Sequence, residues 1–318
     1  MKQLFNYCPV HWYEKEMQSY PGGVDGYLQA NKMDGLELYV YGTEGYPTDY
    51  SKQAVGTHLK FWPYWLDFWR GDKAALLHNF GSEQDVLDYY YGARDNGEWL
   101  AVMRKNVEAS LLVKPKYFVW HVAHCDFDEI FTWNFKYTDA EVIDATIEIV
   151  NAIADSIPDD VTVLFENLWW PGLKLTDPSM VDRLFSGIKK NNVGIMLDTG
   201  HLMNTNINLT NEAEGVDYIC SVAKQLGMYK NYIKGMHLSC SLSGAYLKAK
   251  SWDGKVEKTP AFMMHHITQI DQHKNFKEEG LGRLIACLEP EYVVHELFYD
   301  TMVELAGYLK VQSALLEK

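Results

Sequence analysis

The stretch VGIMLDTGHLMN, residues 193–204, begins as an apolar run and then places Asp198 and His201 three residues apart. A short apolar run bounded by polar residues is typical of a parallel strand that is covered on both faces. In one interpretation, Asp198 caps the start of a helix and both polar side chains are structural. In the other, the strand delivers a carboxylate and an imidazole to a metal ion. The rest of the sequence is needed to choose between the structural and the metal-binding interpretation.

Similar runs recur along the 318 residues, and segments with helical periodicity separate most of them. The sequence predicts strands over 3–10, 35–41, 55–62, 117–122, 161–165, 193–197, 233–238 and 292–297. It predicts helices over 96–112, 137–157, 177–190, 211–226 and 300–316. Strands that alternate with helices in this way indicate a (β/α)8 TIM barrel.

Two connections are longer than a compact barrel requires. One follows the third predicted strand and reaches the helix near residue 96, and the other covers about residues 239–277 after the seventh strand. Long loops in compact domains are usually functional or disordered, and both of these follow the end of the barrel where TIM-barrel enzymes keep their active sites. No repeat or linker interrupts the chain, so we expect a single domain over 1–318.

Composition and short sequence patterns indicate which binding partners and which cellular compartment to expect. The formal net charge of −14 argues against unaided attraction to nucleic acid or to an anionic membrane. The sequence shows neither a signal peptide pattern nor an apolar run of membrane-spanning length, and a cytoplasmic location is the default expectation. The cysteines are scattered and form no C-x-x-C pair, so a disulfide framework and a thiolate zinc site are not indicated.

Polar residues that could bind a metal recur where the later strands end. They lie in the segments FVWHVAH, VLFENLWW, LDTGH, GMHLSC, QIDQHKNF and VVHELF. The candidate ligands are His121, Glu166, Asp198, His201, His237, Asp271, His273 and Glu296. One such residue is usually a cap or a turn residue, but a succession of them on adjacent strands would be costly to bury without a cation. Oxygen and imidazole ligands without sulfur suit Zn²⁺, Mn²⁺, Co²⁺ or Mg²⁺, so we expect a divalent metal cofactor.

The segments FENLWWPG, LDTGH, GMHLS, IDQH and VHELF, in this order, resemble the xylose isomerase-like TIM barrel superfamily. This group contains sugar and sugar phosphate isomerases and epimerases together with endonuclease IV. In the epimerase branch, the resemblance implies one divalent metal held by Glu166, Asp198, His237 and Glu296. Glu166 and Glu296 would also be catalytic, moving a proton through an enediolate. An arginine that commonly follows the histidine of the seventh strand is absent here, where the chain reads HLSCSLSG.

The endonuclease IV branch implies three zinc ions and a larger ligand set, which adds His121, His201, Asp271 and His273. The histidine expected after the third strand has no convincing counterpart, although His58 lies early in HLKFWPYW. The acidic stretch CDFDEIFTWNF also lacks the cations that a DNA backbone would require. The sequence therefore favours a metal-dependent isomerase or epimerase of a small carbohydrate-like substrate, with a zinc phosphoesterase on abasic DNA as the alternative.

Two further alternatives are a metal-assisted glycoside lyase and a sugar-binding barrel without catalysis. Residues that could contact a substrate are Glu37, His58, Trp62 and Trp169. The aromatic segment FWPYWLDFWR could be a lid over the substrate, a subunit interface of a homo-oligomer or a small satellite core. His295 should point away from Glu296 because side chains alternate along a strand, and His124 competes with His121 for the fourth-strand position.

Overall fold

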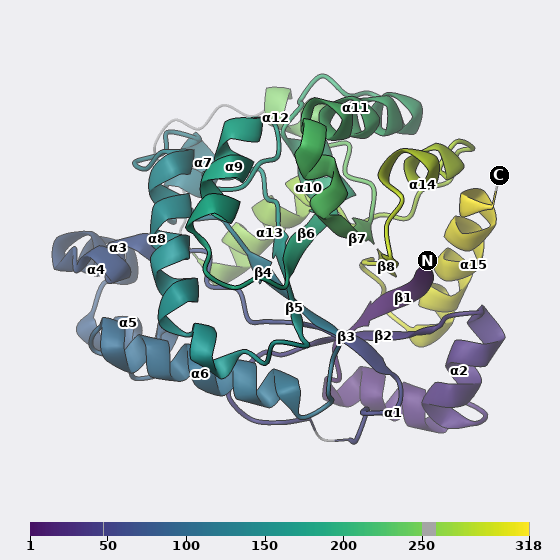
Figure 1. Ribbon diagram of the computed structural model, residues 1–318, viewed down its shortest axis with the longest axis horizontal. Helices are drawn as coiled ribbons and strands as arrows, with labels where there is room; N and C mark the ends of the chain where they lie inside the picture. The colour runs from purple at the N-terminus through teal and green to yellow at the C-terminus, as the bar shows by residue number, and fades with distance from the viewer. Residues whose placement is uncertain (47, 250–258, 318) are drawn as a thin grey trace.

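The eight strands form a closed parallel barrel in sequence order, β1 to β8. The computed structural model in Figure 1 describes residues 1–46, 48–249 and 259–317. The strands are β1 (Lys2–Tyr7), β2 (Gly35–Tyr39), β3 (Ala54–His58), β4 (Tyr117–His121), β5 (Thr162–Glu166), β6 (Val193–Asp198), β7 (Ile233–Leu238) and β8 (Tyr292–His295). All eight predicted strands are present, and the prediction of a (β/α)8 barrel is confirmed.

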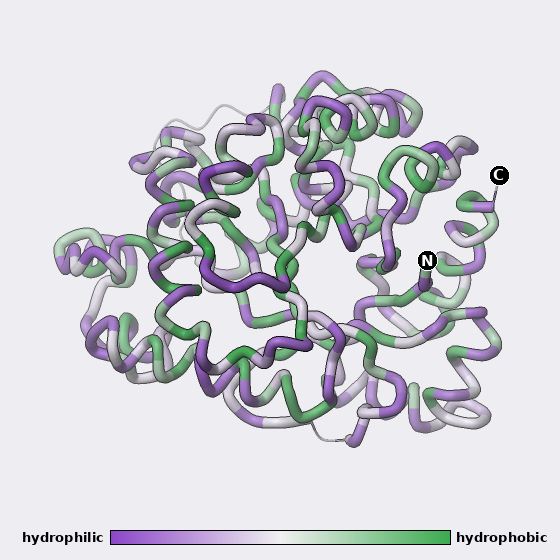
Figure 2. Tube along the Cα trace, in the orientation of Figure 1, coloured by the Kyte–Doolittle hydropathy of each residue, from purple (hydrophilic) through white to green (hydrophobic). Residues whose placement is uncertain are grey.

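Helices surround the barrel (Figure 1). Those of the first half are α1 (His11–Ser19), α2 (Gly23–Asn31), α3 (Leu66–Arg70), α4 (Lys73–Phe80), α5 (Glu83–Tyr89), α6 (Asn96–Leu111), α7 (Glu129–Thr132), α8 (Asp139–Ala152) and η1 (Ala154–Ser156). Those of the second half are α9 (Pro178–Gly187), α10 (Thr199–Asn204), α11 (Glu212–Gln225), η2 (Gly227–Tyr232), α12 (Gly244–Ala249), α13 (Pro260–Ile270), α14 (Gly282–Leu288) and α15 (Met302–Leu316). Hydrophilic and hydrophobic residues alternate along the outer helices, as Figure 2 shows. No helix in the described ranges has the length and apolar character needed to cross a membrane.

The predicted helix boundaries rest on capping chemistry. Thr138 and Glu141 form a capping box that starts α8, as the sequence suggests. Asp177 caps α9, and the proline that follows it occupies the first turn, where its missing N–H costs nothing.

Strand β3 ends earlier than predicted. Its pairing with β4 runs as far as His58 opposite Val119, and the chain then leaves the sheet. The N–H of Lys60 donates to Oδ1 of Asn106 at 3.1 Å instead of continuing the strand. The early end places His58 at the carboxyl edge of the barrel, where the active sites of this fold lie.

A glycine opens space in the barrel interior below that edge. A Cβ atom on Gly56 would lie 2.1 Å from the ring of Tyr117, so only glycine leaves room for this ring inside the barrel. The hydroxyl of Tyr117 then donates to Oε2 of Glu37 at 2.8 Å. The interior thus carries a polar layer directly beneath the carboxyl ends of the strands.

The long connection after β3 contains α3, α4 and α5, and its aromatic residues mainly pack on one another and on α6. Trp62 is 5% exposed, its Nε1 donates to the carbonyl of Tyr89 at 3.2 Å, and its ring lies edge-on to that of Trp99. The prediction that Trp62 contacts a substrate stays a prediction, at a residue whose ring is largely buried. Its ring packs with other aromatic residues of the insertion in a cluster that is continuous with the main hydrophobic core.

Candidate metal centre

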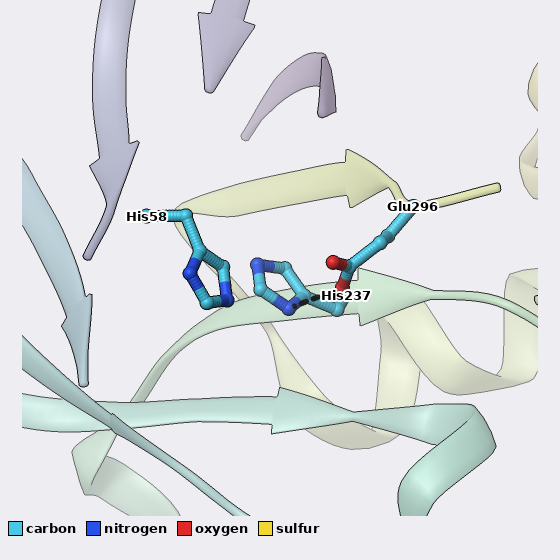
Figure 3. A group of neighbouring side chains, drawn as sticks. All are labelled: His58, His237 and Glu296. Carbon is cyan, nitrogen blue, oxygen red and sulfur yellow. Dashed lines mark ion pairs between the residues drawn. The ribbon is translucent and has the colours of Figure 1, made fainter. Parts of the chain in front are cut away.

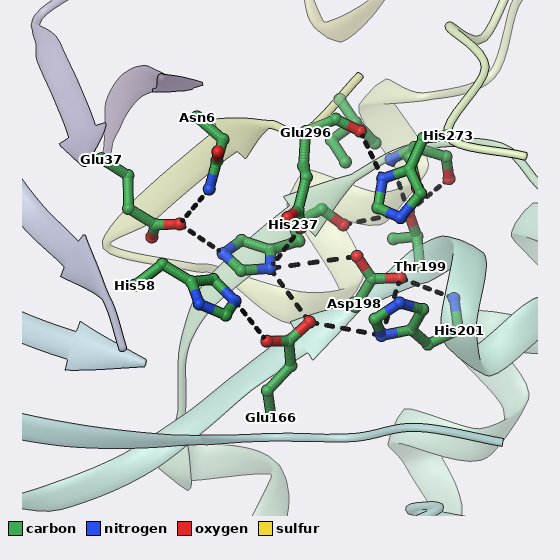
Figure 4. Close-up of polar contacts among 12 residues, drawn as sticks. Asn6, Glu37, His58, Glu166, Asp198, Thr199, His201, His237, His273 and Glu296 are labelled. Atoms are coloured by element: carbon green, nitrogen blue, oxygen red, sulfur yellow. Dashed lines mark hydrogen bonds and ion pairs between the residues drawn. The ribbon is translucent and has the colours of Figure 1, made fainter. Parts of the chain in front are cut away.

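The carboxyl ends of the strands bring nine potential metal ligands together, as the close-up in Figure 4 shows for seven of them. Each strand from β3 to β8 delivers its own residue because parallel strands of a barrel end on the same face. Asp271 and His273 follow α13, and Lys274 pairs with Cys240 after β7, which folds this loop back over the barrel. The nine are His58, His121, Glu166, Asp198, His201, His237, Asp271, His273 and Glu296.

Glu166 lies at the middle of the cluster and is fully buried. Its Oε2 atom is 3.1 Å from Nε2 of His58 and 3.2 Å from Nε2 of His121. Its Oε1 atom is 3.2 Å from Nδ1 of His201 and 3.2 Å from Nδ1 of His237. The two carboxylate oxygens therefore face two different pairs of imidazoles.

A second group forms around His237. Its Nδ1 atom lies 2.7 Å from Oε2 of Glu296 and 3.9 Å from Oδ2 of Asp198. Figure 3 shows the carboxylate of Glu296 beside this imidazole, with His58 on the other side. Because Glu166 reaches the same nitrogen, four ligand atoms from four consecutive strands converge here.

Asp198 caps a helix with one carboxylate oxygen, and its other oxygen is compatible with the metal-ligand interpretation. Its Oδ1 atom accepts a hydrogen bond from the backbone N–H of His201 at 2.5 Å, which caps α10. Its Oδ2 atom is buried and accepts no hydrogen bond from the described residues. One oxygen starts the helix, and the other is left for a ligand role.

A third group joins His201 to the loop after α13. Oδ2 of Asp271 lies 3.3 Å from Nε2 of His201 and 2.7 Å from Nε2 of His273. His273 has a φ of 41°, in the left-handed region that non-glycine residues seldom occupy. Such backbone strain concentrates at functional sites.

Fixed acceptors orient most of these histidines. Three of them place Nδ1 at 2.9 to 3.0 Å from a backbone carbonyl, so this nitrogen carries the proton and Nε2 faces the cluster. The pairs are His58 with Leu59, His201 with Asn167, and His273 with Glu296.

Glu37 orients the fourth histidine in the same way. Its Oε1 atom lies 3.0 Å from Nε2 of His237, which leaves Nδ1 free to face the second group. Glu37 is fully buried, and it also accepts hydrogen bonds from Asn6 and Tyr117. The predicted substrate contact of Glu37 stays a prediction, and in this structure both of its oxygens bond to protein groups beneath the cluster.

Buried polar atoms that lack hydrogen-bond partners make this cluster suitable for binding a cation. Three buried side-chain atoms within it have no hydrogen-bond partner among the described residues: His121 Nδ1, Asp198 Oδ2 and Asp271 Oδ1. Two of the three are carboxylate oxygens, whose burial without a counter-charge is costly. Oxygen and imidazole donors within 4.8 Å of one another form four groups among the described residues, and three of these groups together contain all nine ligands and match divalent metals. These three groups are His58–His121–Glu166, Glu166–Asp198–His237–Glu296 and His201–Asp271–His273.

The protonation of the cluster reflects competition between burial and charge. Burial, followed by the neighbouring carboxylates of Glu296 and Glu166, raises the pKa of Asp198 to about 7. Burial opposes ionisation of Glu296, but the imidazole of His237 lowers the pKa of Glu296 to about 2. Burial lowers the pKa of His121 to about 3, so this imidazole is neutral and available as a ligand.

A cavity of about 750 Å³ opens above the cluster. Its floor includes His58, His121, His201 and Glu296, and aromatic side chains supply much of the wall. Trp169 lines the cavity with its ring centroid 5.3 Å from that of His201, so its predicted substrate contact stays a prediction with a suitable position. Tyr39 and Phe298 also line the wall and are not among the predicted site residues, although they lie two residues after Glu37 and Glu296 respectively.

Two other histidines point away from the cluster, and the alternation of side chains along the strand predicted this for His295. Nδ1 of His124 accepts the N–H groups of Trp65 and Leu66 at 3.2 and 3.1 Å, which anchors the insertion after β3. His295 faces Gln3 and Gln312 on the outer side of the barrel wall.

Comparison with known proteins identifies the family. Residues 34–282 match the family described as xylose isomerase-like TIM barrel. Endonuclease IV from Thermus thermophilus superposes with a TM-score of 0.53 at 12% identity, over 100% of this chain and 99% of that chain. D-psicose 3-epimerase in the presence of D-fructose gives a TM-score of 0.50 at 16% identity, over 98% and 90%. No curated protein matches the chain. The chain belongs to the xylose isomerase-like TIM barrel family.

Proposed function

We propose that this protein is a multinuclear metal-dependent phosphoesterase that acts on a small substrate. The observation that carries the proposal is the position of Glu166, whose Oε2 atom faces Nε2 of His58 and His121 and whose Oε1 atom faces Nδ1 of His237. A carboxylate in this position is suited to bridge two metal ions. Multinuclear sites of this kind are common in enzymes that cleave phosphate esters.

The chain would hold the metals in the three groups defined above. Bound divalent ions would supply a hydroxide nucleophile at neutral pH and stabilise charge on the phosphoryl group. Glu37 holds the tautomer of His237, and three backbone carbonyls hold those of His58, His201 and His273. The protein therefore fixes its ligands before substrate arrives, which is what electrostatic preorganisation requires.

The surroundings of Glu166 weigh against the proton-transfer role that the epimerase resemblance implied. Each of its oxygens already faces two imidazoles. Burial alone would raise the pKa of Glu166, but the imidazoles of His121 and His237 have the larger effect and hold this pKa well below its ordinary value. A general base works best with a pKa near the working pH and a free path to the substrate. We therefore assign Glu166 as a ligand.

A small substrate fits the rim of the cavity better than abasic DNA does. The described residues that line the cavity include no lysine or arginine, whereas Asp300 and Glu304 lie among them. Phosphate contacts from cations provide most of the affinity for a nucleic acid backbone. A substrate with one phosphoryl group needs no such surface, because the metal centre itself would meet its charge.

An isomerase or epimerase is the second candidate, and one specific feature favours it. The group formed by Glu166, Asp198, His237 and Glu296 is complete without the other ligands, and Glu296 also lines the cavity. One metal ion in this group, with Glu296 moving the proton, would suffice for that reaction.

Metal stoichiometry separates the two candidates. We expect two or three divalent ions per chain by plasma mass spectrometry, together with hydrolysis of a panel of phosphate esters. Asp271→Asn should remove about one ion and most of the hydrolysis, whereas the exposed His78→Ala serves as the matched control. A single ion per chain, with turnover of a ketose and no effect of Asp271→Asn, would establish the isomerase instead.

A further inference from the structure

Each histidine on the floor of the cavity is paired with an aromatic ring in its wall. The ring centroids lie 4.3 to 5.3 Å apart, and all four aromatic side chains line the cavity. The pairs are Tyr39 with His58, Phe61 with His121, Trp169 with His201 and Phe298 with His273. These rings surround the position that a group bound at the metal ligands would occupy.

The polar side chains of the wall are largely engaged with the protein. Asn6 donates to Glu37, the hydroxyl of Tyr13 donates to the carbonyl of Tyr299, and the hydroxyl of Thr268 donates to the carbonyl of His265. Recognition of a polyol needs free donors and acceptors that pair with its hydroxyl groups. The three engaged groups are therefore not free to pair with a polyol, while the hydroxyls of Tyr39 and Tyr299 and the carboxylate of Asp300 also line the cavity.

The mouth of the cavity is apolar as well. Tyr41, Met264 and Phe298 are 54%, 55% and 53% exposed, and all three line the cavity. Large apolar side chains gathered at an opening mark a site that receives an apolar group. Tyr41 packs on Tyr39 with ring centroids 4.3 Å apart, so the aromatic wall continues from the floor to the mouth.

We propose that the substrate carries a planar apolar ring, such as an aryl group or a heteroaromatic base, directly beside the group that meets the metal ligands. The aromatic wall would bind the ring by stacking, which adds to the free energy gained from its burial. This inference rests on the metal centre of the proposed function, and it is independent of which reaction that centre catalyses.

Hydroxamates test the inference without turnover because they chelate divalent metals in many active sites. Calorimetry on the zinc-loaded full-length chain would compare benzohydroxamate, acetohydroxamate and gluconohydroxamate, which carry a ring, a methyl group and a polyol. We expect benzohydroxamate to bind at least about tenfold more tightly than either of the others. Equal or tighter binding of gluconohydroxamate would overturn the inference.

Tyr41→Ala tests the wall at a position that does not touch a metal ligand, and Met228→Ala, 69% exposed and outside the cavity, is its control. Tyr41→Ala should weaken benzohydroxamate binding about three- to tenfold and leave acetohydroxamate binding unchanged. A preference for benzohydroxamate that survives in both Tyr41→Ala and Phe298→Leu would contradict the assignment of these rings. If phosphate esters are not cleaved but the preference is present, the proposed reaction fails and this inference stands.

Discussion

Oε1 of Glu37 lies 3.0 Å from Nε2 of His237, which joins β2 to β7 across the interior of the barrel. These strands are not neighbours in the sheet, so no backbone pairing relates them. The contact fixes which nitrogen of His237 carries the proton. It therefore couples a fully buried residue to the geometry of the candidate metal ligands.

Glu37→Gln should weaken metal binding while leaving the fold intact. The amide keeps the size of the side chain but loses the charge that orients His237, and loss of such outer partners typically costs about 10- to 100-fold in metal affinity. Competition with a fluorescent chelator measures the effect. Unchanged affinity in this variant would show that His237 is oriented by other means.

Tyr117→Phe should destabilise the protein by about 1–3 kcal/mol, because it removes a buried donor to the carboxylate of Glu37. Urea unfolding measures the change in the free energy of unfolding. Tyr308→Phe is the matched control, since that hydroxyl also bonds a glutamate but at a partly exposed position, and it should have a smaller effect. An equal loss in the two variants would argue against a special role for the interior contact.

Removal of metal should lower the melting temperature of the wild-type chain, since ions that bind only the folded state stabilise it by mass action. Asp198→Asn should abolish most of this shift and raise the stability of the metal-free protein above pH 7. The asparagine can still cap α10, and it removes a carboxylate whose ionisation is opposed by burial. Thermal unfolding with and without chelator checks both expectations. A metal-free Asp198→Asn protein that is less stable than the wild type would disprove the second.

Acid should destabilise the protein partly through His124. Burial lowers the pKa of this imidazole to about 3 in the folded protein, whereas its ordinary value is 6.5. The unfolded chain therefore binds the additional proton, and stability falls as the pH decreases from about 6.5 towards 3. The slope attributable to His124 is at most about 1.4 kcal/mol per pH unit.

His124→Asn should flatten this slope, because a neutral amide oxygen can accept the same two backbone N–H groups without titrating. Unfolding in chelator across this pH range isolates the effect from loss of metal. Equal slopes in the variant and the wild type would assign the acid sensitivity to other groups.

Much of the architecture follows from local patterns in the sequence. Apolar runs such as 193–197 predict the strands because buried parallel strands need apolar side chains on both faces. Their polar ends predict the ligands because all the strands end on one face of the barrel. The position of His58 at the end of a strand was harder to predict, because the aromatic run that follows it prolongs the predicted strand to residue 62. Its position depends on the contact between Lys60 and Asn106, which are distant in sequence.

The roles of Glu37 and Trp62 could not be read from local patterns for a related reason. Strand alternation directs the side chain of Glu37 into the barrel. How far below the carboxyl ends of the strands it lies depends on neighbours such as Tyr117. Trp62 lies in a segment whose composition suits both a lid and a core, and only its packing against Trp99 distinguishes them. In both cases the deciding contacts join elements far apart in the chain.

The distribution of the ligands over six consecutive strands also bears on how the barrel opens. His58 ends β3 and Glu296 follows β8, and the groups that contain these two residues share Glu166. Parallel barrels are built from βα units that can detach separately, in cooperative segments of different stability. Ions bound across these strands would link the segments, so we expect amide hydrogen exchange in β3 to β8 to occur in separate steps without metal and in one concerted step with it.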